Sequence, residues 1–123
     1  MENLSYKVIG CVLEVYKTLG PGLLESVYEA ALMKEFSLRG IHAQNQVPID
    51  INYKGESIAD GFRLDILVED ELVLELKSVD EVKTVHFKQI VTYLKLTGKK
   101  VGLLINFNVD DMMKGIHRVA NGC

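Results

Sequence analysis

Two carboxylates and an ammonium group stand at a spacing that suits metal chemistry. Asp65 lies within residues 62–68, and Glu75 and Lys77 lie within residues 72–78. Carboxylate oxygens are the ligands that hard divalent cations such as Mg²⁺ prefer. A lysine beside them can orient or deprotonate a water molecule. These residue types therefore fit a metal site with a cationic neighbour, provided that the fold brings them together.

The apolar residues around these groups predict how the fold would do so. They occupy every second position of both segments: Leu64, Ile66, Val68, Leu72, Leu74 and Leu76. If these share one face of a β-hairpin, then Asp65, Glu75 and Lys77 share the other face. A three-residue connection centred on Asp70 would place Asp65 directly opposite Glu75.

Such a pair of carboxylates has two interpretations. Two acids on adjacent strands repel each other, and charges leave water only with partners. A divalent cation would resolve the repulsion. The same spacing also fits a salt-bridged polar face in which Lys77 pairs with Asp65 or Glu75, because Glu-x-Lys triplets are common. The spacing leaves both interpretations open.

Further polar residues point toward the same place. Glu25 shares a helical row with Tyr28, Leu32 and Phe36, which turns it toward the interior; it also fits a first-turn acid that complements the helix dipole. His86, Gln89 and Tyr93 follow i, i+3, i+7 spacing on a later helix. That stripe also fits a partly exposed polar flank.

The elements that must position these residues follow from periodicity. Apolar residues at helical spacing predict helices at 4–19, 23–39 and 82–97, and Asp110 can cap a final helix at 111–120. Alternation and short apolar runs predict strands near 47–53, 56–60, 62–68, 72–78 and 101–107. Lys54-Gly55 predicts a hairpin turn, and Pro48 predicts an edge strand. The expected order is roughly ααββββαβα.

This order predicts the α/β class, with a mixed sheet flanked by helices. Consecutive strands suggest antiparallel pairing, and the strand–helix–strand segment 72–107 suggests a parallel crossover. The 123 residues, 48% hydrophobic and 25% charged, are typical of a single soluble domain spanning 1–123. No signal peptide or membrane helix is expected. Cys11 and Cys123 do not suggest a disulfide framework, so we expect a cytoplasmic protein.

The charge is unevenly distributed along the chain. The net charge is −3, yet residues 83–123 hold seven Lys or Arg against two Asp or Glu, whereas residues 1–82 hold seven against fifteen. The basic part could face phosphates. It could equally keep surface loops soluble.

Three motifs together resemble a known family. Residues 22–28, with Gly22, Glu25 and Tyr28, fit a G-x-x-E-x-x-Y pattern. Asp65 with Glu75-Leu76-Lys77 fits D…E-x-K, and residues 89–93 fit Q-x-x-x-Y. By these motifs, from about residue 4 to 119, the chain resembles the GxxExxY family of the PD-(D/E)XK nuclease superfamily. One departure is Leu64, which stands where the superfamily has proline.

The resemblance implies a restriction-endonuclease-like core and a metal-dependent nuclease that acts on nucleic acid, with DNA favoured. Asp65, Glu75 and the backbone carbonyl of Leu76 would hold Mg²⁺ or Mn²⁺, and Lys77 would assist the attacking water. Glu25 would join the site, and Gln89 and Tyr93 would position substrate or water. Lysines of the basic part would meet the nucleic-acid backbone: Lys83, Lys88, Lys95, Lys99 and Lys100.

Two other functions remain open at this point. A non-catalytic or partner-dependent nucleic-acid-binding module would retain the fold and its acidic balance. A hydrolase of small nucleotides would use the same metal site within a closed pocket. A homodimer, or a complex with a partner protein, is compatible with each function.

Overall fold

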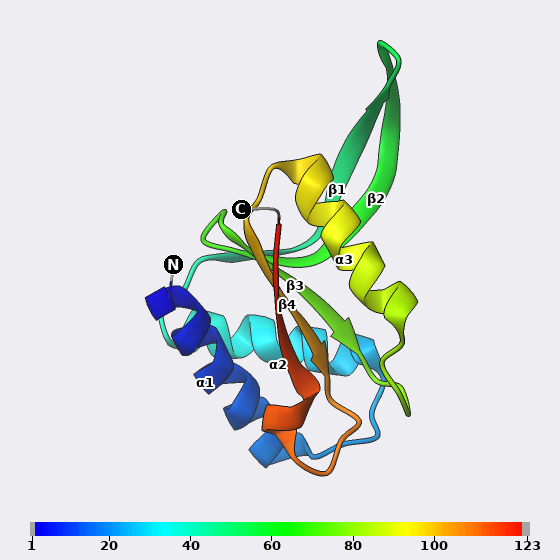
Figure 1. Ribbon diagram of the computed structural model, residues 1–123. Helices are drawn as coiled ribbons and strands as arrows, with labels where there is room; N and C mark the ends of the chain where they lie inside the picture. The colour runs from blue at the N-terminus through cyan, green and yellow to red at the C-terminus, as the bar shows by residue number, and fades with distance from the viewer. Residues whose placement is uncertain (1, 122–123) are drawn as a thin grey trace.

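The computed structural model describes residues 2–121 of the chain (Figure 1). Its helices are α1 (Glu2–Leu19), α2 (Glu25–Leu38), α3 (Thr84–Thr97) and the 3-10 turn η1 (Met112–Gly115). Its strands are β1 (Ala43–Tyr53), β2 (Glu56–Val68), β3 (Leu72–Lys77), β4 (Val101–Asn106) and β5 (Ile116–Ala120). Cys123 lies outside the described residues, and Cys11 is a free cysteine buried in α1.

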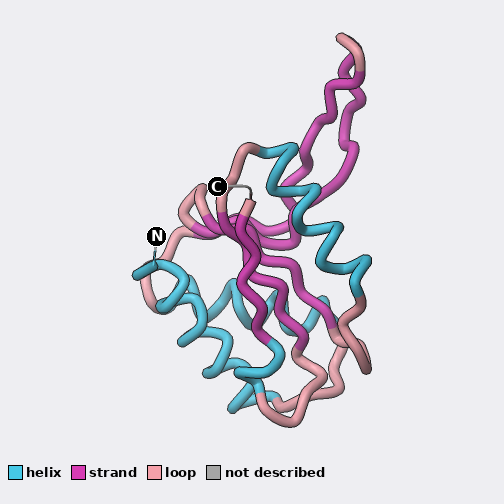
Figure 2. Tube along the Cα trace, in the orientation of Figure 1, coloured by secondary structure: helices cyan, strands magenta, loops and turns pink. Residues whose placement is uncertain are grey.

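The strands form one mixed sheet in the order β1-β2-β3-β4-β5. The pair β3–β4 is parallel, and its crossover is α3; all other neighbouring pairs are antiparallel. Helices α1 and α2 cover one face and α3 lies over the other (Figures 1 and 2). The predicted mixed sheet flanked by helices is therefore confirmed.

Two apolar clusters hold these layers together. The larger cluster joins α1 and α2 to the sheet through side chains such as Val12, Leu32 and Leu74. The smaller cluster joins α3 to the opposite face through Ile90 and Leu94. Because β4 is buried on both faces, its sequence reads as a continuous apolar run up to Ile105 rather than as alternation.

The C-terminal segment differs from the sequence prediction. Residues 111–120 do not form a helix: they form η1 and then β5, which pairs antiparallel with β4. Asp111, rather than Asp110, caps the turn, since its side chain accepts a hydrogen bond from the backbone N–H of Met113 at 3.2 Å. Pairing with the otherwise open edge of β4 outweighs the local helical pattern.

The hairpin of β1 and β2 is longer than expected. Residues 56–60 do not form a separate short strand, because β2 runs continuously from Glu56 to Val68. The predicted turn at Lys54-Gly55 is confirmed; both residues have positive φ, 51° and 89°, as a tight hairpin turn requires. Pro48 lies in β1, which is an edge strand as predicted. The outer part of this hairpin projects beyond the body (Figures 1 and 2).

Within residues 2–121, no helix combines the length and apolar character that crossing a lipid bilayer requires.

Candidate functional site

The hairpin of β2 and β3 brings the two carboxylates together. The strands pair Val68 with Leu72 and Ile66 with Leu74, and the continuation of this register sets Asp65 opposite Glu75. The side chains cross-link the strands: the backbone N–H of Asp65 donates to Glu75 Oε2 at 3.1 Å. In return, the backbone N–H of Leu76 donates to Asp65 Oδ2 at 2.8 Å. The register predicted from the leucines is confirmed.

Glu75 is buried, with 4% exposure, and Asp65 is half-buried. Burial, and after it the negative charge of Asp65, raises the pKa of Glu75 to about 8. Burial also raises the pKa of Asp65, and the hydrogen bond from Leu76 opposes that rise. A carboxyl pair of this kind holds a proton at neutral pH unless a cation replaces it.

Lys77 does not supply that cation by direct pairing. Its positive charge lowers the pKa of both carboxyl groups, so its ammonium lies within electrostatic reach. None of the ion pairs found among residues 2–121 involves Lys77, however. The salt-bridged polar face, one of the two interpretations of the spacing, is therefore not what the structure contains.

The oxygen atoms at this site suit a hard divalent cation that is bound by few protein ligands. Asp65 and Glu75 offer carboxylate oxygens, and Leu76, between Glu75 and Lys77, offers a carbonyl. No group of three or more His, Cys, Asp or Glu side chains in the described part of the chain could hold a metal ion. Mg²⁺ commonly binds through one or two carboxylates and keeps several waters, so two carboxylates suffice.

Glu25 approaches the hairpin from the start of α2. The backbone N–H of Ser78, directly after Lys77, donates to Glu25 Oε2 at 3.3 Å. The hydroxyl of Ser78 donates to the backbone carbonyl of Leu23 at 2.6 Å. The charge of Glu25 also raises the pKa of both Asp65 and Glu75. The structure therefore brings Glu25 to the edge of the carboxylate pair, where it remains exposed.

Tyr28 fixes the loop that precedes Glu25. Its hydroxyl donates to the carbonyl of Gly20 at 2.6 Å and accepts from the backbone N–H of Leu23 at 3.1 Å. Its ring stacks on Phe107, with 4.1 Å between centroids. The tyrosine thus connects the turn between α1 and α2 to the segment after β4.

Sequence reasoning missed Glu29. Its charge raises the pKa of Asp65, and its carboxylate accepts hydrogen bonds from the side-chain amides of Asn45 at 3.0 Å and Gln46 at 2.8 Å. The available signal was spacing, because Glu29 follows Glu25 by four residues on the same helix.

Sequence reasoning also missed how Asn106 supports the site. This side chain, 3% exposed, lies beside Lys77 in the β3–β4 register. Its amide donates to the carbonyl of Val79 at 2.9 Å and accepts from the N–H of Val79 at 3.1 Å. Asn106 therefore fixes the loop that leaves β3 directly after the candidate site.

The three polar residues of α3 are placed differently from one another. Tyr93 is near the carboxylates, whose charges add to the burial that raises its pKa. Gln89 lies one turn before Tyr93 and is exposed, and no hydrogen bond joins it to the carboxylates within residues 2–121. His86 accepts a hydrogen bond from the N–H of Lys83 through Nδ1 at 2.9 Å, which closes the first turn of α3.

The face assignment of Leu64 was wrong. Leu64 packs in the cluster on the α3 side, whereas Ile66 and Val68 pack on the α1–α2 side. An irregularity lies opposite in β1, where Gln46, between the paired residues Asn45 and Val47, has a positive φ of 51°. The alternation in β2 therefore changes beside Asp65.

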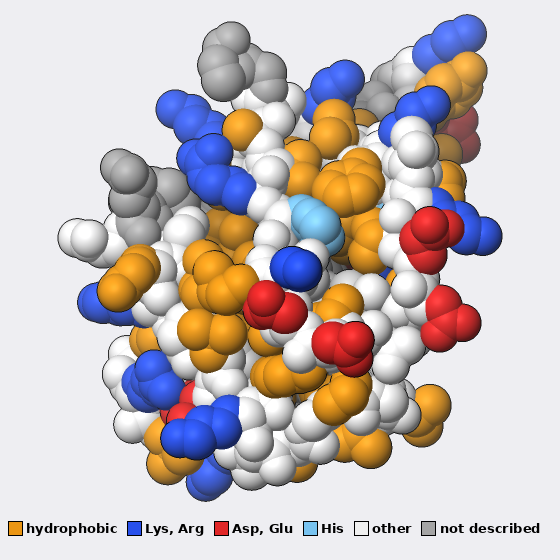
Figure 3. All heavy atoms as spheres, turned by 60° about the horizontal axis from the view of Figure 1, so that its bottom comes forward, with side chains coloured by type: hydrophobic (Ala, Val, Ile, Leu, Met, Phe, Trp, Pro, Cys, Tyr) orange, Lys and Arg blue, Asp and Glu red, His pale blue; other side chains and the backbone are white. Residues whose placement is uncertain are grey.

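Basic side chains are spread among apolar and acidic ones on the face shown in Figure 3. Lys99 donates from Nζ to the carbonyl of Asp70 at 2.8 Å, in the turn between β2 and β3. Of the five lysines expected to meet a nucleic-acid backbone, Lys99 is therefore engaged at the opposite end of the hairpin from Glu75.

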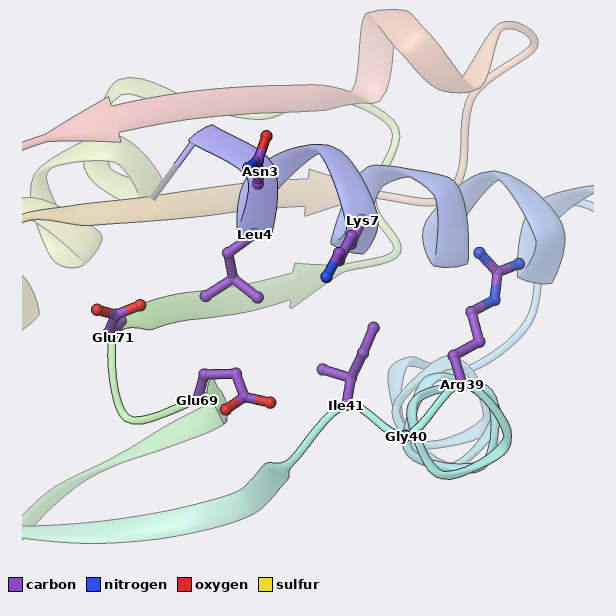
Figure 4. Close-up of a pocket in the computed structure, with 8 residues that line it drawn as sticks. All are labelled: Asn3, Leu4, Lys7, Arg39, Gly40, Ile41, Glu69 and Glu71. Atoms are coloured by element: carbon purple, nitrogen blue, oxygen red, sulfur yellow. The ribbon is translucent and has the colours of Figure 1, made fainter.

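A hollow of about 700 Å³ lies at that opposite end. Side chains of α1, of the end of α2 and of the β2–β3 turn surround it, among them Lys7, Arg39 and Glu69 (Figure 4). Because Glu71 precedes β3 and Glu75 lies near its end, this hollow is separate from the carboxylate pair.

Comparisons with known proteins agree with this architecture. A family model described as the PD-(D/E)XK nuclease superfamily matches residues 2–119. The crystal structure of SSO0001 is similar in fold, with a TM-score of 0.59 and 19% identity. The match covers 80% of this chain and 51% of that protein, so this chain spans about half its length. No curated protein matches the sequence.

Proposed function

This chain belongs to the PD-(D/E)XK nuclease superfamily, and we propose that it is a nuclease that hydrolyses phosphodiester bonds, with DNA as the favoured substrate. The G-x-x-E-x-x-Y pattern around Glu25 and Tyr28 supports placing it in the GxxExxY branch. The mixed sheet and flanking helices agree with the restriction-endonuclease-like fold of the superfamily. The reaction would take place where Asp65, Glu75 and Lys77 meet.

The observation that carries the proposal is the buried carboxylate pair. Asp65 and Glu75 cross-link adjacent strands, and the pKa of Glu75 is raised to about 8. Strongly perturbed carboxyl groups next to a lysine are typical of sites that do chemistry. Because none of the ion pairs among residues 2–121 involves Asp65 or Glu75, we propose that a Mg²⁺ or Mn²⁺ ion neutralises the two carboxylates.

Each residue then has a proposed role. Asp65, Glu75 and the carbonyl of Leu76 would hold the ion. When bound, Mg²⁺ would polarise the phosphate and lower the pKa of a bound water. Lys77 would orient or deprotonate the attacking water, or stabilise the charge that develops on phosphate.

The surrounding side chains would complete the site. Glu25 would contact the ion through a water or support a second ion, since its carboxylate is anchored beside Lys77 by the N–H of Ser78. Tyr93 is near the carboxylates and would position the nucleophilic water or a phosphate. Gln89, exposed one turn away, would contact substrate instead.

Cleavage assays test the proposal. Single- and double-stranded DNA and RNA would be incubated with Mg²⁺ or Mn²⁺ and with wild-type protein, Glu75→Ala or Glu71→Ala. Glu71 is an exposed acid directly before β3 and serves as the matched control. We expect cleavage by wild type and Glu71→Ala only. Equal rates for Glu75→Ala would refute the assignment.

A second candidate is a nucleic-acid-binding module that needs a partner or has no activity alone. The observation that favours it is that the described residues contain no group of three potential side-chain metal ligands. A second copy or a partner protein would then complete the site. Mn²⁺ titration distinguishes the two: binding that disappears in Asp65→Ala and Glu75→Ala supports the enzyme.

We also take residues 1–123 to form one domain, since both apolar clusters pack against the same sheet.

A further inference from the structure

The outer part of the β1–β2 hairpin, residues 50–61, is called the arm. It extends away from the sheet and from α3 (Figures 1 and 2). Apart from Ile51, which is half-buried, its residues are exposed. A two-stranded ribbon is only marginally stable in water by itself, so a ribbon that projects in this way needs stabilising contacts at its base and a functional reason for its length.

The arm is anchored at its root by internal contacts. The ring of Phe62 stacks on Tyr93 of α3, with 4.2 Å between centroids. Asp60 forms an ion pair with Arg63 at 3.0 Å, and its N–H donates to Asp50 Oδ1 at 2.9 Å. The stack of Phe62 on Tyr93 joins the root of the arm to α3, and the other two contacts lie within the hairpin.

The same root is continuous with the candidate site. Tyr93, the stacking partner of Phe62, is near the carboxylates of Asp65 and Glu75. In β1, before the arm, Asn45 and Gln46 donate to Glu29, whose charge acts on Asp65. A ligand that contacts both the site and the arm would therefore lie along one connected surface.

The chemistry of the arm is concentrated at its tip. Asp60 forms an ion pair with Arg63, and the carboxylate of Asp50 accepts a hydrogen bond from a backbone N–H. The other two charged side chains of the arm are those of Lys54 and Glu56. Tyr53 is 60% exposed, and Nζ of Lys54 lies 5.3 Å from the centre of its ring. An exposed aromatic face beside an ammonium suits a nucleobase with its phosphate, because stacking tolerates any base.

A second copy of the chain fits this surface less well. Stable interfaces bury about 800 Å² on each partner and involve roughly 20–30 residues a side. The arm has twelve residues, and its exposed large apolar side chains are Tyr53 and Ile58. A duplex also fits less well, since stacked bases hide their faces and the tip offers a single cation to its phosphates.

We propose that the arm binds an unpaired nucleic-acid strand beside the cleavage site, with Tyr53 stacking on a base and Lys54 contacting phosphate. The inference rests on the proposed function and adds a substrate class to it: nucleic acid with a single-stranded segment. From Phe62 to Glu56 the arm rises about 20 Å, at roughly 3.3 Å per residue. At 3.4 Å or more per nucleotide, about six nucleotides or fewer span that distance.

Binding measurements in the Glu75→Ala background test this without cleavage. Fluorescence anisotropy would compare labelled single strands of 3 and 16 nucleotides with a 16-base-pair duplex. We expect Tyr53→Ala to weaken binding of the long strand roughly tenfold, as loss of one stacked base predicts. Binding of the trinucleotide and of the duplex should change little. Tyr53→Phe should bind the long strand as Tyr53 does, because it keeps the ring.

Tyr6→Ala is the matched control, since Tyr6 is 81% exposed on α1, away from the arm. Equal affinity of Tyr53→Ala and Tyr6→Ala for the long strand would overturn the inference, even where cleavage confirms the nuclease. An equal loss of affinity for the duplex would also overturn it. The inference would also be overturned if sedimentation showed that the protein is a dimer, that Tyr53→Ala dissociates this dimer, and that strand binding is unchanged. Absence of any strand binding would also overturn the inference, whereas the cleavage assay with wild-type protein decides the proposed function separately.

Discussion

Replacing Glu75 by glutamine should change how stability depends on pH. The pKa of Glu75 in the fold is about 8, above its ordinary value of 4.5. Below pH 4.5 both the folded and the unfolded chain hold the proton. Between these values the folded chain binds it and the unfolded chain does not, so the free energy of unfolding falls as pH rises from 4.5 to about 8 and then levels off, with the contribution of the protonated carboxyl lost. Glu75→Gln removes this dependence.

The magnitude follows from the same difference. A shift from 4.5 to about 8 is worth on the order of 5 kcal/mol. Because water entry and small movements relieve part of the repulsion with Asp65, we expect Glu75→Gln to be more stable than wild type by roughly 2–4 kcal/mol at pH 9. At pH 5 the two should differ little, since glutamine can still accept the hydrogen bond from the N–H of Asp65.

Urea denaturation in EDTA, from pH 5 to pH 9, measures this difference. At a slope of about 1–3 kcal/mol per molar urea, the midpoints should separate by roughly 1–2 M at pH 9. Glu71→Gln, which replaces an exposed carboxyl directly before β3, should follow wild type throughout. Parallel curves for wild type and Glu75→Gln across this range would refute the raised pKa and the argument that a cation must neutralise the pair.

Three further outcomes follow from the site. Mn²⁺ should bind more tightly as pH rises toward 8, up to tenfold per unit, because the ion displaces a proton from Glu75; a flat calorimetric profile would contradict this. Tyr28→Phe should lose about 1–2 kcal/mol in urea unfolding, since the carbonyl of Gly20 loses its donor; an unchanged midpoint would show that water replaces it. Asn106→Ala should lose roughly 2–3 kcal/mol and accelerate proteolysis after Lys77, whereas the exposed control Asn52→Ala should not; equal proteolysis would refute the role in the loop.

The β2–β3 hairpin was predictable because its information is local. Leucines at every second position and a three-residue turn determine the register, and the register determines which carboxylates meet. The same principle failed at Leu64, where the alternation breaks opposite the irregular backbone at Gln46. The side chain of Gln46 also bonds Glu29 of α2, a contact between residues 17 positions apart in the sequence.

The features that the sequence analysis did not predict depend on contacts between residues far apart in the chain. Residues 116–120 carry a weak helical pattern, yet the open edge of β4 makes them a strand. Asn106 looked like the end of an apolar strand, and its bonds to Val79 exist only because α3 returns the chain beside β3. Tertiary pairing supplies the energy in both cases, so local propensity does not decide the outcome.

Glu25 and Tyr28 belong to one short motif but are subject to different selection. Tyr28 stacks on Phe107 and holds the α1–α2 turn, so its loss would harm folding in any descendant. Glu25 is exposed and, on the proposed function, serves the site, so a descendant that abandons catalysis would be free to replace it. On the same proposal, among sequences that carry the tyrosine, the acidic position would separate candidate nucleases from inactive relatives, and the tyrosine would report only that the scaffold persists.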